Sequence, residues 1–262
     1  MIFSSLASGS SGNCFFIGEN KKTGVLIDAG ISCKQIAERL NFFNINSHAI
    51  KAIFITHEHT DHIRGAEVFS RKFNIPIFTS KGTIENSSIN LPEKNIKQIG
   101  NNESVKIGGI EIEAFSKSHK AKEPLSYTLI GKGEINKNKR VSIITDAGYC
   151  CNNIIGEIKD ADFLCLESNH DLEMLENGPY PLFLKRWIKS NDGHLSNLQA
   201  SIAVLENSSQ KLKHLVLAHL SQTNNTPKIA LNTFSKLLKE RSDLKLELNI
   251  STREKPTNLV RI

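Results

Sequence analysis

Residues 56–62, Thr-His-Glu-His-Thr-Asp-His, constrain this chain more than any other stretch. They follow a short apolar run at residues 52–55, which predicts a buried strand. The residues after them, 64–69, predict the start of a helix. Three imidazoles and a carboxylate therefore stand where a strand ends, and in layered α/β folds ligands collect at that edge of the sheet.

The side-chain types in this stretch predict a metal centre. His57 and His59 alternate along an extended loop and so point the same way. Asp61 and His62 come one turn later, where they can face a second centre. Neutral imidazole and carboxylate suit zinc, manganese or iron, and the lack of thiolate argues against a purely structural zinc site. A polar, histidine-rich turn is the alternative, but this order directly after a buried strand favours metal.

Side chains of the same kind recur at the ends of other predicted strands. In each case an apolar run is followed by a carboxylate or an imidazole, and these residues are Asp28, His119, Asp146, Glu167 and His219. A carboxylate in such a position can bridge two metal ions. The recurrence predicts that one rim of the sheets gathers the donors.

The run H-x-H-x-D-H from His57 to His62 resembles the signature of the metallo-β-lactamase superfamily. The resemblance implies two divalent ions, zinc, manganese or iron, and a hydroxide that Asp61 orients or deprotonates. It further implies that Asp28 supports the histidine loop by hydrogen bonds. The implied ligands are His57, His59 and His119 for one ion and Asp61, His62 and His219 for the other, with Asp146 as the bridge.

Two capping boxes predict helix starts. Ser32 is followed by Gln35, and Ser196 is followed by Gln199, in the spacing that satisfies the first amides of a helix. The second helix is expected to carry Leu198, Ile202 and Leu205 inward.

His194 lies on the loop ahead of that second helix. An imidazole there can stabilise a scissile phosphate and donate a proton to the leaving oxygen. A histidine packed beside the helix start is the alternative, because chain position does not show where a loop side chain points.

Five runs of residues narrow the resemblance to the YycJ/WalJ branch of the superfamily, whose members are described as metal-dependent exonucleases acting from the 5′ end of DNA. The specific part of the resemblance is residues 193–197 and 219–225, and residues 167–171, 178–182 and 184–186 add to it. A related pattern occurs in the tRNA 3′-processing endonucleases, which implies phosphodiester chemistry assisted by Glu167 and His194. The chain departs from the branch at Trp187, where arginine is usual.

Several residues are expected to contact the substrate. The small-residue turn at residues 8–13 connects two strands, and its backbone amides can also form an anion-binding nest. A formal charge of +6 and a pI of about 9.0 favour an anionic partner, although a solvated lysine surface would give the same numbers. The expected contacts are Ser10, Ser11, Asn13, Asn169, His170 and Lys185, with Lys117, Lys120 and Lys122 as a basic rim around His119.

The alternation of strand and helix signals over 262 residues predicts a single α/β domain spanning 1–262. With the resemblance, the expected fold is an αββα four-layer sandwich, two mixed sheets flanked by helices. No stretch reads as a secretion signal or a membrane span, so we expect a cytoplasmic protein with no membrane partner. The five cysteines are odd in number and lack metal-type spacing, so reduced thiols are expected.

The leading hypothesis is a 5′-to-3′ exonuclease acting on DNA. One alternative is an RNA-cleaving endonuclease of the tRNA 3′-processing type. Another is a hydrolase of a thiolester, a lactone or a cyclic nucleotide. A non-enzymatic, nucleic-acid-binding relative is disfavoured, because loss of the metals would be expected to alter some of the seven ligand positions.

Overall fold

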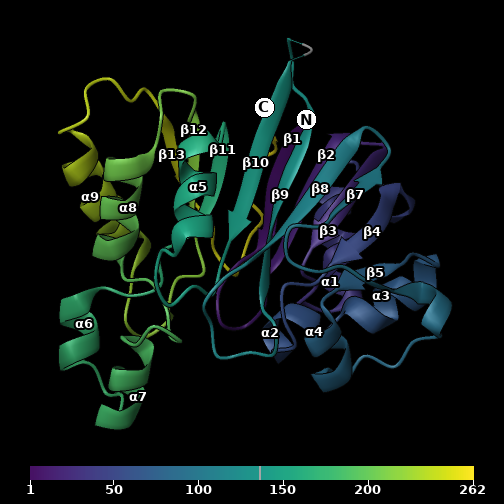
Figure 1. Cartoon of the computed structure of the whole chain (residues 1–262), viewed down its shortest axis with the longest axis horizontal. Helices are drawn as coiled ribbons and strands as arrows, with labels where there is room; N and C mark the ends of the chain where they lie inside the picture. Colours follow the sequence, from purple (N-terminus) through teal and green to yellow (C-terminus); the bar gives the residue numbers. More distant parts are fainter. Residues whose placement is uncertain (136) are drawn as a thin grey trace. The chain divides into compact units, whose positions relative to one another are not determined.

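The computed structural model describes residues 1–135 and 137–262. It contains two mixed sheets of seven strands each, flanked by helices, which confirms the predicted fold class (Figure 1). The chain divides into two compact units. Unit 1 comprises Met1–Ser116, Ala121–Lys139 and Thr252–Ile262, and unit 2 comprises Lys117–Lys120 and Arg140–Ser251. The single domain over 1–262 stays a prediction.

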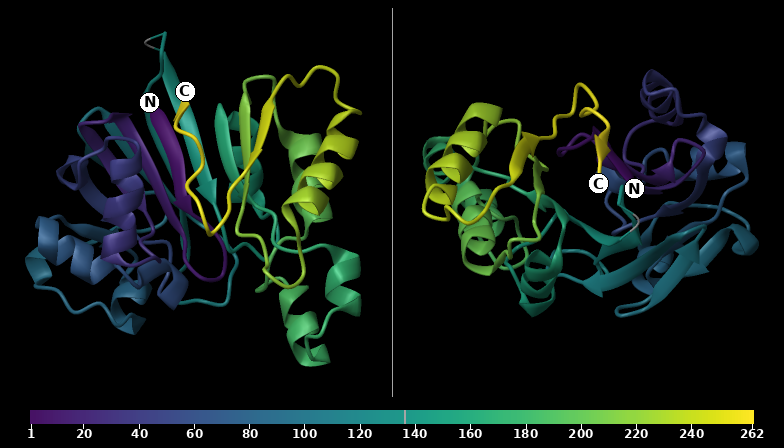
Figure 2. Two further views of the ribbon diagram at one scale, coloured as in Figure 1. Left: turned by 180° about the vertical axis from the view of Figure 1, so that it is seen from behind. Right: turned by 90° about the horizontal axis from the view of Figure 1, so that it is seen from above.

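The first sheet lies in unit 1 and has the strand order β14-β1-β2-β3-β4-β5-β6. Strands β1 to β3 are antiparallel, whereas β3 to β6 are parallel. The last strand pairs antiparallel with the first, so both chain ends lie side by side (Figure 2). The strands are β1 (Ile2–Ala7), β2 (Cys14–Asn20), β3 (Thr23–Ile27), β4 (Ile50–Phe54), β5 (Ile77–Thr79), β6 (Ile96–Gln98) and β14 (Val260–Arg261).

The parallel pairing of β3 and β4 sets up the site in unit 1. Because the two strands run the same way, their carboxyl ends meet at one edge of the sheet. Asp28 follows β3 and residues 56–62 follow β4, so these segments are adjacent at that edge.

Helices of unit 1 supply the apolar core against this sheet. Helix α1 begins after Ser32, and the predicted capping box with Gln35 is confirmed. Ile36 and Leu40 of α1 and Phe69 of α3 are fully buried in one cluster with the strands. The helices are α1 (Cys33–Phe42), α2 (Thr60–Ile63), α3 (Ala66–Phe73) and α4 (Lys81–Asn86), with short 3₁₀ turns η1 (Ser47–Ala49) and η2 (Glu93–Asn95).

Helix α2 corrects the prediction that the helix starts only after the histidine motif, at residues 64–69. Thr60–Ile63 already form one helical turn, so Asp61 and His62 lie on a helix. The cause is local: the His59 carbonyl accepts the amides of His62 and Ile63, which closes the turn.

The second sheet has the strand order β13-β12-β11-β10-β9-β8-β7. Unit 1 contains β7 (Ser104–Ile107), β8 (Ile110–Ser116) and β9 (Leu125–Lys132), which are antiparallel neighbours. A hairpin joins β7 and β8, and Gly108 takes the left-handed conformation, φ 60°, at its turn. Strands β10 (Asn138–Ile144), β11 (Phe163–Glu167), β12 (His214–Ala218) and β13 (Glu247–Ile250) are parallel, and from Arg140 onward they belong to unit 2.

The parallel strands of unit 2 are near-continuous apolar runs, as expected for strands covered on both faces. Three of the helices, α5, α8 and α9, lie beside them in Figure 1. The helices of this unit are α5 (Asn152–Asp160), α6 (Leu172–Asn177), α7 (Leu182–Ile188), α8 (Asn197–Asn207) and α9 (Pro227–Leu238).

The inward face of α8 was predicted wrongly. Its capping box at Ser196 and Gln199 is present, but Leu198 and Ile202 are 39% and 37% exposed. The buried face consists of Asn197, Ala200, Ser201, Ala203 and Val204. These side chains are small, so the helix approaches its neighbours closely and its large apolar residues are displaced to the outer face.

None of the described helices is both long enough and apolar enough to cross a membrane. The five cysteines are free thiols, and Cys14, Cys33 and Cys165 are buried.

The capping box of α1 gives a first prediction. Ser32→Ala removes the side-chain acceptor of the Gln35 amide and should lower the free energy of unfolding by about 1 kcal/mol. Ser32→Asp restores an acceptor and should lie within a few tenths of a kcal/mol of the parent. Urea denaturation of the three proteins measures this. Equal destabilisation by both substitutions would contradict a capping role.

Candidate metal centre

Four predicted ligands lie together in unit 1. His57 and His62 are fully buried, whereas His59 and Asp61 are half-buried at the start of α2. His57 Nε2 lies 3.0 Å from His59 Nδ1, and His62 Nε2 lies 3.4 Å from Asp61 Oδ2. Nitrogen and oxygen donor atoms thus converge at the carboxyl end of β4.

Asp28 fixes the protonation of two of these imidazoles. Its Oδ2 accepts hydrogen bonds from His62 Nδ1 at 2.7 Å and from Thr56 Oγ1 at 3.0 Å. A carboxylate only accepts, so His62 carries its hydrogen on Nδ1 and presents a lone pair on Nε2. The Thr56 hydroxyl, which donates to Asp28, accepts from His57 Nδ1 at 2.9 Å. The lone pair of His57 is therefore also on Nε2.

The backbone around Asp28 is shaped to reach the histidine motif. Asp28 takes a left-handed conformation, φ 57°, and its Oδ1 accepts the Thr56 amide at 2.8 Å. A Cβ at Gly30 would lie 1.6 Å from the Asp61 carbonyl oxygen, so only glycine allows this approach.

Asn13, predicted to bind substrate, is buried against the ligands. Its Oδ1 accepts the Gly9 amide at 3.0 Å, which closes the turn between β1 and β2. Its Nδ2 lies 3.2 Å from His62 Nε2 and 3.3 Å from Asp61 Oδ2. The other two predicted residues of this turn, Ser10 and Ser11, are exposed.

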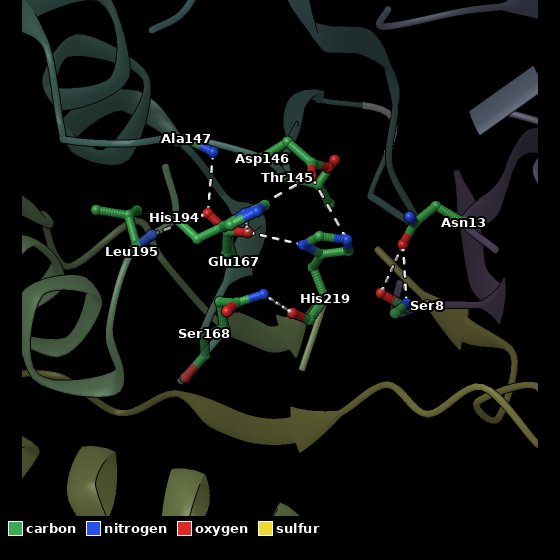
Figure 3. Close-up of polar contacts among 12 residues, drawn as sticks. Ser8, Asn13, Thr145, Asp146, Ala147, Glu167, Ser168, His194, Leu195 and His219 are labelled. Carbon is green, nitrogen blue, oxygen red and sulfur yellow. Dashed lines mark hydrogen bonds and ion pairs between the residues drawn. The ribbon is translucent and has the colours of Figure 1, made fainter. Parts of the chain in front are cut away.

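A second group of donors lies in unit 2. Asp146 follows β10, Glu167 ends β11, His219 follows β12, and His194 lies on the loop before α8. One donor atom from each of these four residues lies within 4.8 Å of the others. Figure 3 shows Glu167 between His194 and His219.

Glu167 orients both histidines. Its Oε1 accepts from His219 Nδ1 at 2.7 Å and from His194 Nδ1 at 2.9 Å. Its Oε2 accepts the amides of Ala147 at 2.9 Å and Leu195 at 3.1 Å. Burial alone would raise the pKa of Glu167, but the charges of the two histidines and their hydrogen bonds lower it to about 2. This carboxylate is therefore ionised and fully engaged, which gives it a positioning role.

The remaining imidazole atoms face Asp146. His219 Nε2 lies 3.4 Å from Asp146 Oδ1, and His119 Nε2 lies 3.9 Å from the same atom. His119 Nδ1 lies 3.2 Å from the Gly193 carbonyl oxygen, which can only accept, so this histidine also presents a lone pair on Nε2. Burial lowers the pKa of His119 to about 3, so it is neutral at physiological pH.

Other predicted contacts take positions that the sequence does not indicate. Asn169 donates to the His219 carbonyl at 3.0 Å. His170 is fully buried, and burial lowers its pKa to about 4. Lys185 Nζ donates to the Glu176 carbonyl at 2.6 Å. Their contact with substrate stays a prediction.

Lys117 does not belong to an exposed basic rim. It is 6% exposed, and its Nζ donates to the Thr145 carbonyl at 2.6 Å. Sequence reasoning also missed two residues that orient imidazole rings, Thr56 through its hydroxyl and Gly193 through its carbonyl. Thr56 directly precedes the predicted ligand His57, and Gly193 directly precedes the predicted catalytic residue His194. This adjacency was the signal that could have found them.

Solved structures of other proteins share the fold of this chain. The chain is similar to the metallo-β-lactamase fold protein YhfI from Bacillus subtilis, with 15% identity, a TM-score of 0.67 and 98% of each chain covered. It is also similar to PqqB from Methylobacterium extorquens, with 14% identity, a TM-score of 0.71 and coverage of 98% of this chain and 100% of that one.

The sequence comparisons decide the family. The Beta-lactamase superfamily domain matches residues 23–219. The chain is 38% identical over 244 residues to the exodeoxyribonuclease YycJ of Bacillus anthracis, covering 91% of this chain and 89% of that protein. It is 37% identical over 235 residues to the exodeoxyribonuclease WalJ of Streptococcus pneumoniae serotype 2, covering 87% and 84%. The chain belongs to the metallo-β-lactamase superfamily, in the YycJ/WalJ family.

The metallo-β-lactamase fold implies divalent-metal binding, and the donor chemistry of both units fits it. In each unit a buried carboxylate fixes imidazole hydrogens on Nδ1 and leaves Nε2 lone pairs directed at other donor atoms. Two nitrogens bound to one tetrahedral zinc at 2.0–2.1 Å would lie about 3.3 Å apart. The 3.0 Å between His57 Nε2 and His59 Nδ1 is close to that separation.

Asp28→Asn tests the carboxylate of unit 1. Asparagine tolerates the left-handed backbone, but its amide nitrogen cannot accept from His62 and its oxygen carries no charge. Metal affinity should fall by about 10- to 100-fold. Competition with a chelating dye measures this, and Asp160→Asn, an exposed carboxylate at the end of α5, is the matched control. Unchanged affinity in a folded Asp28→Asn protein would contradict the assignment.

Proposed function

We propose that this protein is a metal-dependent phosphodiesterase that removes nucleotides from the 5′ end of DNA. The observation that carries the proposal is the arrangement around Glu167. One carboxylate holds His219, a ligand candidate, and His194, which the ligand set leaves unused, side by side. Hydrolysis of a phosphodiester needs a metal site to activate water and a nearby imidazole outside the ligand set to protonate the leaving group, and this arrangement offers both.

The ligand set that the family signature implies would hold two divalent ions. Zinc and manganese suit this donor set best, and iron fits its chemistry as well. His57, His59 and His119 would hold one ion, Asp61, His62 and His219 would hold the other, and Asp146 would contribute to both. Such a pair lowers the pKa of bound water to about 7 and stabilises charge on phosphate oxygens.

The chain's own residues provide orientation and proton transfer. Asp61, half-buried beside His62, orients the attacking water. His194 is 12% exposed in its side chain, and its Nδ1 is engaged by Glu167. Proton donation to the leaving oxygen would therefore come from Nε2 of the doubly protonated His194 ring, which keeps its Nδ1 hydrogen on Glu167 and is left neutral.

Two further observations support DNA as the substrate class. The relatives that match at 37% and 38% identity over most of the chain are both named exodeoxyribonucleases. The formal charge of +6 favours a polyanion and predicts binding that weakens with salt.

Labelled oligonucleotides test the reaction. Single- and double-stranded DNA carrying a label at the 5′ or the 3′ end is incubated with the protein and Mn²⁺ or Zn²⁺, with and without a chelator. We expect mononucleotides from the 5′ end, and the chelator should abolish their release. Internal cleavage of RNA, or turnover of a thiolester or cyclic nucleotide but not of DNA, would contradict the proposal.

His194→Ala separates proton transfer from metal binding. The variant should keep both metals and lose on the order of 10²- to 10⁴-fold in turnover, the usual contribution of a general acid. His48→Ala, in η1 of unit 1, is the control and should retain activity. Metal analysis that finds fewer ions in His194→Ala than in the parent would rule out the assigned role.

A further inference from the structure

We propose that Trp187, at the end of α7, is the positioning residue that holds the His194 ring for proton transfer. This inference deepens the proposed function, because it concerns the histidine that serves the leaving group. Trp187 contacts His194 directly, with ring centroids 5.5 Å apart and planes at 88°. This is the edge-to-face arrangement that aromatic rings prefer.

The backbone of the His194 loop is anchored to the same helix. The His194 amide donates to the Ile188 carbonyl at 2.9 Å, and Ser190 Oγ donates to the Trp187 carbonyl at 2.7 Å. A Cβ at Gly193 would lie 2.2 Å from the Ile188 oxygen and 2.3 Å from the Trp187 oxygen. The loop therefore folds tightly over the end of α7, so the helix fixes both the backbone and the ring of His194.

The hydrogen bond to Glu167 alone does not fix the His194 ring. One bond at Nδ1 sets which nitrogen carries the hydrogen, but it leaves the ring able to tilt about that contact. The rings of His119 and His219 each lie 5.3 Å from His194 by their centroids, on the ligand side. Trp187 adds a further aromatic contact to the His194 ring. Together these contacts restrict His194 Nε2 to one orientation.

Trp187 orients His194 through its aromatic ring rather than through its N–H. Its Nε1 is buried and has no hydrogen-bond partner among the residues that the structure describes. An aromatic ring without an N–H should therefore do the same work. This makes Trp187→Phe the conservative variant and Trp187→Ala the disruptive one.

Steady-state kinetics with DNA distinguish positioning from other roles. Trp187→Ala should lower kcat on the order of tenfold to a hundredfold, because small displacements of a catalytic group cost that much. KM and the metal content should stay near the parent values, and Trp187→Phe should recover most of kcat. Phe183→Ala is the matched control, because it also truncates an aromatic residue of α7, one turn earlier, where the side chain is 74% exposed. This variant should leave kcat unchanged.

Other outcomes overturn the proposal. A raised KM with unchanged kcat would show that Trp187 stacks on a base of the substrate instead. Failure of Trp187→Phe to recover kcat, or a kcat in Trp187→Ala equal to that of the parent, would also refute it.

A spectroscopic measurement tests the contact without relying on activity. Trp187 is the chain's one tryptophan, so His194→Ala should shift its emission, whereas His48→Ala should not. Nitrogen NMR should find the His194 hydrogen on Nδ1 in all three proteins, because Glu167 sets it, with broadened His194 resonances only in Trp187→Ala, where the ring is free to tilt. If the parent does not hydrolyse DNA, the proposed function fails, but these two measurements still decide the positioning role. An unshifted emission in His194→Ala would refute that role.

Discussion

A hydrogen bond between a buried carboxylate and an imidazole Nδ1 is the interaction on which the rest of the site depends. It occurs in unit 1 between Asp28 and His62 and in unit 2 between Glu167 and His219. A buried charge is costly unless it is paired and hydrogen-bonded, and Glu167 meets this requirement with four donors, two of them backbone amides. Each bond places the imidazole hydrogen on Nδ1, so the opposite nitrogen carries a lone pair for a cation. The structure therefore fixes protonation states before any metal binds.

Much of this could be predicted from the sequence, because its physical causes are local. Apolar runs predicted strands, and the run at residues 52–55 overlaps the observed β4, Ile50–Phe54. The capping boxes at Ser32 and Ser196 were predictable because each needs only a hydroxyl and an amide three residues later. Parallel strands bring their carboxyl ends to one edge, so the donors after β10, β11 and β12 were expected to meet.

The remaining features depend on packing between distant segments. The two histidine partners of Glu167 come 27 and 52 residues later, and no local pattern tells which oxygen meets which ring. Lys117 looked like a surface cation, yet it is buried because the Thr145 carbonyl receives its ammonium. The buried face of α8 depends on which small side chains permit close approach, whereas its large apolar residues suggested the opposite face. The sequence did not indicate the contact between Trp187 and His194, because it depends on how the loop that joins them folds back at Gly193.

Anomalous diffraction from manganese- or zinc-soaked crystals tests the central claim most directly, because it locates the ions and the imidazole nitrogens that bind them. We predict two peaks about 3.5–4 Å apart, with His62 and His219 bound through Nε2 and their Nδ1 atoms still on Asp28 and Glu167. A metal bound to Nδ1 of either histidine, or to Asp28 or Glu167 itself, would contradict the account, as would a single peak in place of two.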